Sequence, residues 1–230
     1  MRPVSRGDAP RAYRKYEDAI GDLEERLGTY CSYCERRLPV SLAVEHVAPK
    51  SLDSSRKTDW ANFLLACTNC NSAKGDQPTS EGDFLWPDRD NTLRAFTCES
   101  GGFVTVAASL PGSIGLKARA LIDLVGLNRH KKHGWPRPAR RDKRWTQRAD
   151  TWELAEKWEK AIAAFSPEGR QQAVELVRDL ALGYGFFSVW MTVFADEADI
   201  RLALIKAFSG TATDCFDKSG NMVPRPDGHL

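Results

Sequence analysis

Hydrophobic residues recur at helical spacing near both ends of the chain. Between residues 10 and 27, apolar and tyrosine side chains share one helical face and charged residues occupy the other, with Pro10 at the start and Gly28 after the end. The same spacing predicts further helices at 116–127, from about 142 to 165, from 167 to 184 and at 195–208. The C-terminal half is therefore expected to be mainly helical, and the polar tail from residue 218 onwards to be frayed.

The middle of the chain has short apolar runs instead. Residues 42–47 (LAVEHV) and 62–67 (NFLLAC) each predict a short strand, and the polar residues between them predict a loop. Residues 93–96 and 103–107 flank the sequence CESGG, which predicts a hairpin with a glycine-containing turn. This mixture predicts an α+β protein. We expect it to be organised as an N-terminal helix (1–27), a central region of strands with a hairpin (28–110) and a mainly helical C-terminal region (111–230).

The composition is that of a folded chain. Of the 230 residues, 42% are hydrophobic and 10% are aromatic, which excludes a disordered chain. No run of about 18 apolar residues occurs, so we expect no membrane span. The N-terminus also lacks the apolar stretch of a secretory signal. We therefore expect a soluble cytoplasmic protein that does not associate with membranes.

Basic residues are concentrated in one segment. Residues 129–148 contain nine lysines and arginines and a single acid, Asp142, so this segment carries a net charge of +8 although the whole chain carries only +2. Such a block is typical of a surface that faces a polyanion, although a solvated linker explains it equally well. The candidates for nucleic-acid contacts in this block are Arg137, Arg140, Arg141, Lys143 and Arg144.

Four of the six cysteines form two C-x-x-C pairs. Cys31 pairs with Cys34 and Cys67 pairs with Cys70, and 32 residues separate the two pairs. Disulfides do not persist in a reducing cytosol, whereas two such pairs are typical of a tetrahedral structural Zn²⁺ site. We therefore predict one zinc ion bound by these four thiolates, with a folded segment between the pairs.

The residues between and just after the cysteine pairs include groups suited to phosphodiester hydrolysis. His46 is a candidate general base, because the ordinary pKa of histidine, about 6.5, lies near neutral pH. Glu45 and Asn71 offer oxygen ligands for Mg²⁺ or Mn²⁺, which would act as a Lewis acid on the scissile phosphate. Because neighbouring strand residues point to opposite faces, a bulge or turn would have to reorient Glu45 or His46. Asn62 would orient the His46 ring.

Two lysines in the same region, Lys50 and Lys74, are candidates for contacts with phosphate groups. Taken one at a time, residues such as Glu45, His46 and Asn62 are more often ordinary surface or turn residues. Only their joint position between two zinc knuckles indicates a catalytic site. A zinc-stabilised module that binds nucleic acid without cutting it therefore stays open as an alternative.

This arrangement resembles the HNH endonucleases that carry a zinc ribbon. The shared frame runs C-x-x-C, Glu45-His46, Asn62 about sixteen residues later, and then C-x-x-C-N-x-x-K-G, and it covers about 50 of the 230 residues. The resemblance implies a ββα-metal fold with His46 as base, Glu45 and Asn71 on the metal, and Asn62 as a positioning residue. Many members have histidine where this chain has Asn71, and the asparagine favours Mg²⁺ or Mn²⁺ over a softer metal.

Further segments are similar to the HNH component of Septu and retron-associated anti-phage systems. They are 30–36 (YCSYCER), 44–46 (VEH), 49–51 (PKS), 70–76 (CNSAKGD), 84–88 (FLWPD) and 124–129 (LVGLNR). In those systems the nuclease works with an ATPase of the SMC or RecF type, so this resemblance implies a DNA-cutting effector with such a partner. A stand-alone restriction-like or homing nuclease is the alternative that keeps the catalytic role.

Overall fold

A computed structural model describes residues 1–80, 82–129 and 142–230 of the chain. Its architecture is α+β, as predicted, with two antiparallel strand pairs surrounded by helices. The elements in chain order are η1 (Tyr16–Ala19), α1 (Ile20–Leu27), β1 (Leu42–His46), η2 (Ser54–Arg56), η3 (Trp60–Asn62), β2 (Phe63–Cys67), α2 (Thr68–Lys74), α3 (Thr92–Ala95), β3 (Phe96–Cys98), β4 (Val104–Val106), α4 (Gly112–Leu124), α5 (Arg144–Ile162), η6 (Pro167–Gly169), α6 (Arg170–Tyr184), α7 (Phe187–Val193), α8 (Ala198–Ala207) and η7 (Thr213–Cys215), where η denotes a 3₁₀ helix.

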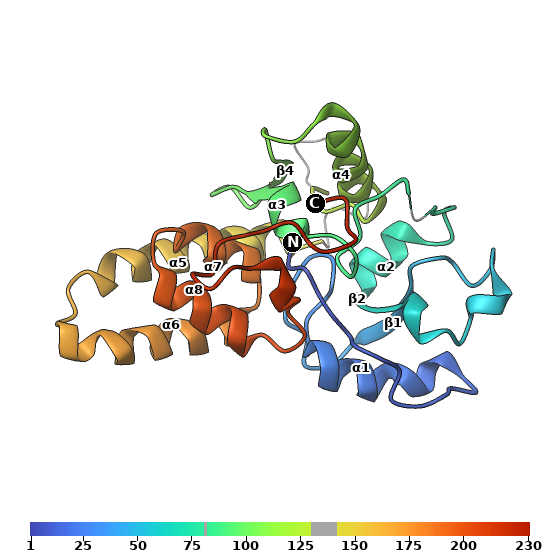
Figure 1. The fold of residues 1–230 in the computed structure, drawn as a ribbon, viewed down its shortest axis with the longest axis horizontal. Coiled ribbons are helices and arrows are strands. Elements are labelled where there is room, and N and C mark those ends of the chain that lie inside the picture. Colours follow the sequence, from blue (N-terminus) through green and yellow to red (C-terminus); the bar gives the residue numbers. More distant parts are fainter. Residues whose placement is uncertain (81, 130–141) are drawn as a thin grey trace.

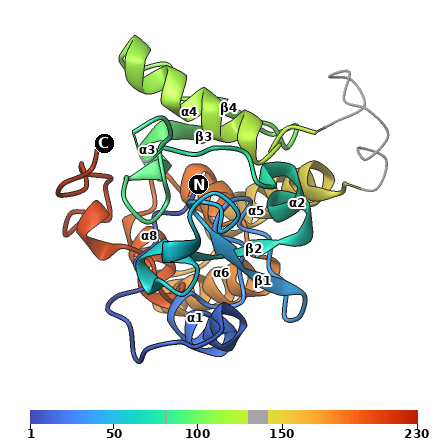
Figure 2. The ribbon, with the colours of Figure 1, turned by 90° about the vertical axis from the view of Figure 1, so that its right-hand side faces the viewer.

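The strands β1 and β2 form the centre of the region with the cysteine pairs. They are antiparallel and in register from Leu42 opposite Cys67 to His46 opposite Phe63. β2 is buried along its whole length, because α1 and α2 both pack on this strand pair. Figure 2 shows β1 and β2 with α1 below them and α2 beside them. The observed bounds of both strands lie within one residue of the predicted ones.

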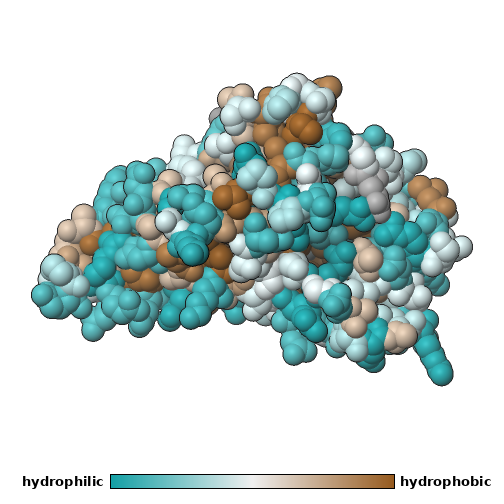
Figure 3. Space-filling view, viewed as in Figure 1, coloured by the Kyte–Doolittle hydropathy of each residue, from teal (hydrophilic) through white to brown (hydrophobic). Residues whose placement is uncertain are grey.

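The C-terminal helices lie beside this strand pair. In Figure 1, α5, α6, α7 and α8 gather on the left, and α3, α4 and the hairpin of β3 and β4 lie above the centre. The predicted hairpin is present, with Phe96 opposite Val106 and Cys98 opposite Val104. On the face shown in Figure 3, hydrophobic side chains occur in small separate groups, including one over α4, where Leu116 is exposed. None of the helices in the described part of the chain has the length and apolar character needed to cross a membrane.

The N-terminal helix is shorter than predicted. η1 and α1 together cover residues 16–27, whereas residues 10–15 are not helical. The reason is that tertiary contacts hold Tyr13. Its ring stacks on Trp60 at a centroid distance of 5.8 Å, and its hydroxyl donates a hydrogen bond of 2.9 Å to Asp22. Packing against distant residues thus outweighs the helical spacing of this short segment.

The C-terminal half differs from its prediction in two places. The helical spacing does not predict α7, because five of its seven residues are buried and leave no amphipathic stripe in its sequence. The tail is not frayed, since the carbonyl of Leu230 accepts hydrogen bonds from the backbone N–H groups of Asn91 and Arg225. The predicted ranges of the other helices agree with α4, α5, α6 with its preceding η6, and α8 to within four residues at each end.

Candidate metal and active site

The two C-x-x-C pairs meet at one point. Cys31 and Cys34 lie in the turn before β1, Cys67 ends β2, and Cys70 lies in the first turn of α2. Their sulfur atoms all lie within 4.8 Å of one another, and those of Cys34 and Cys67 are 3.7 Å apart. Four sulfurs bound at about 2.3 Å to a tetrahedral zinc ion are separated by about 3.8 Å. All four cysteines are buried. The chain therefore has a four-cysteine zinc-binding site in this region.

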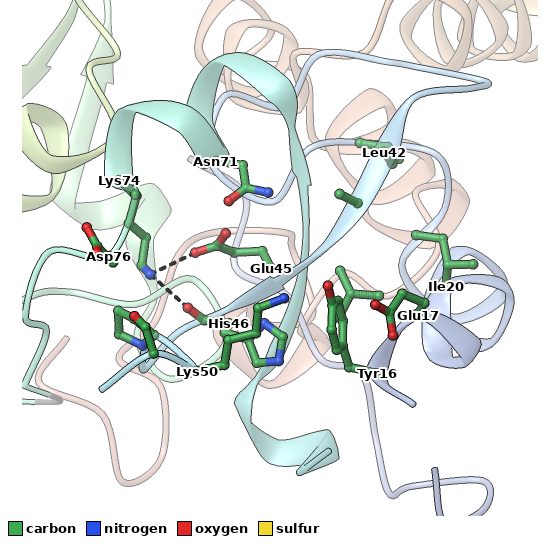
Figure 4. Close-up of a pocket in the computed structure, with 15 residues that line it drawn as sticks. Tyr16, Glu17, Ile20, Leu42, Glu45, His46, Lys50, Asn71, Lys74 and Asp76 are labelled. Atoms are coloured by element: carbon green, nitrogen blue, oxygen red, sulfur yellow. Dashed lines mark hydrogen bonds and ion pairs between the residues drawn. The ribbon is translucent and has the colours of Figure 1, made fainter. Parts of the chain in front are cut away.

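β1 carries the predicted acid and base on opposite sides. Its register with β2 is unbroken, with Glu45 opposite Leu64 and His46 opposite Phe63, so the bulge or turn expected between them is absent from this strand pair. Figure 4 shows the Glu45 carboxylate on the side of α2 and the His46 ring on the side of Tyr16. Both side chains still line one pocket, because this pocket runs along the edge of β1 that does not pair with β2.

The His46 ring is held by contacts in three directions. It meets the rings of Tyr16 and Phe63 edge to face, at centroid distances of 4.9 and 5.2 Å, and its Nε2 lies 2.9 Å from the carbonyl oxygen of Lys57. Because a carbonyl oxygen only accepts, the neutral ring carries its proton on Nε2 and keeps a lone pair on Nδ1. Burial lowers the pKa of His46 below its ordinary value of 6.5, which favours the neutral ring at neutral pH.

Asn62 contacts the backbone rather than the imidazole ring, which corrects its predicted role. Its Nδ2 donates to the carbonyls of Ala48 and Arg56, at 2.9 and 3.3 Å, and its Oδ1 accepts a hydrogen bond of 2.7 Å from the N–H of Ala48. Asn62 is fully buried, and its bonds to Ala48 tie η3 to the start of the loop that follows β1. It supports His46 only indirectly, because this loop contains Lys57, the residue whose carbonyl meets the ring.

Lys74 is buried against β1, which corrects its prediction as a phosphate contact. Its ammonium lies 3.0 Å from Oε1 of Glu45 and donates a hydrogen bond of 2.7 Å to the carbonyl of His46. Only 1% of the Lys74 side chain and 3% of the Glu45 side chain are exposed. Burial raises the pKa of Glu45, and the nearby ammonium opposes this shift. Lys74 therefore supplies the countercharge of a buried carboxylate.

Asn71 lies opposite Glu45 in the pocket, which has a volume of about 560 Å³. Figure 4 shows the two side chains pointing toward one another between β1 and α2. The Glu45 carboxylate contacts Lys74 and Tyr33 among the described residues, and both contacts involve Oε1. Oε2 of Glu45 and the amide oxygen of Asn71 are therefore the atoms that would hold a divalent ion. These oxygen donors fit Mg²⁺ or Mn²⁺, and Mg²⁺ usually keeps several water ligands.

The predicted nucleic-acid contacts have different surroundings. Lys50 is exposed and lines the same pocket, where its Nζ lies 3.7 Å from the centroid of the Tyr16 ring. Lys143 is exposed just before α5. Arg144 is fully buried and bonded inside the protein, so its prediction as a nucleic-acid contact is wrong. Three of the predicted contacts lie outside the described residues: Arg137, Arg140 and Arg141.

Tyr16 is a residue of this site that the sequence did not reveal. It is half-buried, and its ring contacts both the His46 ring and the Lys50 ammonium. In the sequence it is one apolar position of an amphipathic pattern that also includes the core residues Leu23 and Leu27. No local signal separates Tyr16 from those core positions.

None of the curated proteins matches this chain. A family model matches residues 31–77, which extend from the first cysteine of the zinc-binding site to just beyond α2 and include Glu45, His46 and Asn71. The matched family is the HNH endonuclease, and the match supports, at the level of the family, a metal-dependent nuclease that acts on nucleic acid.

Proposed function

We propose that this chain is an endonuclease that hydrolyses phosphodiester bonds in DNA, with Mg²⁺ or Mn²⁺ as the catalytic ion. The observation that carries the proposal is the setting of His46. Its ring is buried, holds its proton on the nitrogen that faces a carbonyl, and lies in the pocket that also contains Glu45 and Asn71. A neutral base beside oxygen ligands for a divalent ion is the combination that phosphodiester hydrolysis requires.

His46 is the general base in this proposal. Its Nδ1 takes a proton from a water molecule as that water attacks the phosphorus atom, and the ring becomes an imidazolium. The carbonyl of Lys57 stabilises the positive ring through Nε2–H. Lys50, exposed beside the pocket, contacts a phosphate oxygen. Glu45 and Asn71 would hold a divalent ion, which would supply Lewis-acid stabilisation of the phosphate and of the departing 3′-oxygen.

Replacing His46 with alanine is expected to lower the rate of DNA cleavage by about 100-fold or more, since general-base catalysis contributes about 10²–10⁴ in rate. The assay follows nicking and linearisation of a plasmid in Mg²⁺ or Mn²⁺. His229→Ala is the matched control, because the His229 ring contacts Lys117 outside the pocket. Zinc content is expected to be unchanged in both variants. Equal cleavage by the wild type and His46→Ala would refute the assigned base.

The cleavage rate is expected to depend on pH through His46. Burial lowers the pKa of this residue below 6.5, so the base is unprotonated at neutral pH and is lost only at more acidic pH. The rate is therefore expected to rise with pH through that pKa and to be level above it. The measurement is kcat/KM across the acidic and neutral range at constant ionic strength. A midpoint above 6.5 would contradict a buried neutral base.

One observation favours a second candidate, a zinc-stabilised module that binds nucleic acid without cutting it. Lys74 already occupies one oxygen of Glu45, which makes this carboxylate a less open metal ligand. Such a module would bind DNA in a salt-dependent manner. It would not cleave DNA, whichever divalent ion is added. Calorimetric titration of Mn²⁺ into the zinc-loaded wild type and Glu45→Gln separates the two candidates. The endonuclease requires an additional Mn²⁺ site that the variant loses.

We also propose that the nuclease is the effector of an anti-phage system and acts with an ATPase of the SMC or RecF type. The support is the similarity of segments 30–36, 70–76 and 84–88 to the nuclease component of Septu and retron-associated systems. Co-purification with the products of adjacent genes, followed by cleavage assays with and without nucleotide, tests this partnership. Full activity of the chain by itself, with no gene for such an ATPase nearby, would favour the stand-alone enzyme.

A further inference from the structure

The zinc-binding site has a close neighbour far along the chain. Arg144, the first residue of α5, is completely buried, and its Nη1 donates a hydrogen bond of 2.9 Å to the sulfur of Cys70. The two residues are 74 positions apart, and Arg144 lies outside the matched segment 31–77. A guanidinium is seldom fully buried without partners for its N–H groups, so the remaining contacts of Arg144 decide what it does there.

All five N–H groups of Arg144 have an acceptor. The two on Nη1 meet the Cys70 sulfur and the carbonyl of Val125, the latter at 2.9 Å. The two on Nη2 meet the carbonyl of Gly126 and the carboxylate of Asp142, both at 2.6 Å. Nε–H donates to the same carboxylate at 2.9 Å. A planar guanidinium held by this many oxygen acceptors has one orientation, and that orientation directs one N–H at the sulfur.

The contact matters for a zinc site because of the charge on the sulfurs. A Zn²⁺ ion with four thiolates carries two units of excess negative charge, and here all four cysteines are buried away from water. An N–H donor disperses part of the charge on the sulfur that it meets, and such outer-sphere bonds fix the orientation of metal ligands. Asp142 pairs with the opposite edge of the guanidinium, so it holds the arginine without taking the donor that faces Cys70.

We propose that Arg144 is an outer-sphere component of the zinc-binding site and that its N–H···S bond helps to retain the metal on Cys70. The helical C-terminal region then takes part in zinc retention through the first residue of α5. This proposal does not depend on nuclease activity, because it concerns only the metal-binding thiolates and their buried donor.

The experiment compares zinc release from two variants that each remove a buried arginine of α5. Arg144→Met is expected to transfer zinc to a colorimetric chelator about 10- to 100-fold faster than the wild type, the range by which outer-shell partners usually change metal affinity. Arg148→Met is the matched control. Arg148 is 2% exposed and donates to the carbonyl of Gly102 rather than to a cysteine of the zinc-binding site. Its release rate is expected to stay within about twofold of the wild type.

A second measurement keeps the proposal testable where Arg144→Met does not fold. Arg144→Lys retains the positive charge but not the planar guanidinium. The wild type, Arg144→Lys and Arg148→Met are loaded with Co²⁺, because the thiolate-to-cobalt charge-transfer band reports on the electrons of the sulfur ligands. Loss of an N–H···S bond is expected to move this band to lower energy in Arg144→Lys and to leave it unchanged in Arg148→Met. An unshifted band in Arg144→Lys, or zinc release from Arg148→Met as fast as from Arg144→Met, would overturn the proposal.

Discussion

Lys74→Met is expected to lower the free energy of unfolding by about 3–5 kcal/mol, the usual cost of removing one partner of a buried ion pair. The pair with Glu45 is almost inaccessible to water, and Lys74 also donates to the carbonyl of His46. Without the ammonium, the buried Glu45 carboxylate has lost its countercharge, and its raised pKa is expected to rise further. The folded state then binds a proton more tightly than the unfolded chain, so the loss of stability is expected to shrink as the pH falls.

Urea denaturation at two pH values measures this loss. The double variant Glu45→Gln with Lys74→Met is expected to recover part of the stability, because no uncompensated charge is left in the interior. Lys206→Met, at an exposed position of α8, is the control and is expected to change the free energy of unfolding by no more than about 0.5 kcal/mol. A loss that is equal at both pH values, with no recovery in the double variant, would show that Lys74 does not compensate Glu45.

Cys67→Ser is expected to abolish zinc binding and to unfold the region around β1, β2 and α2. Structural zinc contributes about 10–16 kcal/mol in small zinc-binding peptides, which equals or exceeds the whole stability of a typical domain. Cys67 ends the fully buried strand β2, and the N–H of Cys70 also meets its sulfur, so both the strand and the start of α2 depend on this residue. Zinc content by mass spectrometry and near-ultraviolet circular dichroism measure the two effects.

Cys98→Ser is the control for this experiment. Cys98 is also buried but lies in β3, outside the four-cysteine cluster. We expect this variant to keep a full equivalent of zinc and to lose only the small stability of one buried thiol. If Cys67→Ser also keeps its zinc and its near-ultraviolet spectrum, the four-cysteine site does not hold the structure together.

The sequence was sufficient for the features that rest on local spacing. The two C-x-x-C pairs, the short strands on either side of the loop and the long helices of the C-terminal half are each encoded by residues close together in the chain. Asn62 is a residue whose role spacing does not determine. Its residue type and position predict that it orients the His46 ring, but its hydrogen-bond partners are backbone groups of Ala48 and Arg56. Whether its side chain meets the imidazole or the backbone depends on the path of the loop after β1, which the sequence pattern does not give.

Arg144 and Phe187 show two other limits of the sequence. Arg144 belongs to a block of positive charge, and only the fold distinguishes a buried donor to a sulfur atom from a surface contact to phosphate. Phe187 begins α7, which is preceded by Phe186 in the left-handed conformation and is buried on most sides. Because buried residues occupy most of its sides, α7 lacks the periodicity by which a helix is recognised in a sequence, and only the fold identifies it.

The position of Tyr16 limits how far the segment that matches the HNH family model can be shortened. This residue precedes the matched segment 31–77, yet its ring forms one wall of the space around the imidazole. A truncated protein of residues 31–77 would keep His46 but would expose its ring to water on the side that Tyr16 covers. Grafting the segment onto another scaffold therefore requires the recipient to supply an aromatic side chain of its own, and the smallest portable unit that keeps the surroundings of His46 starts before the first cysteine pair.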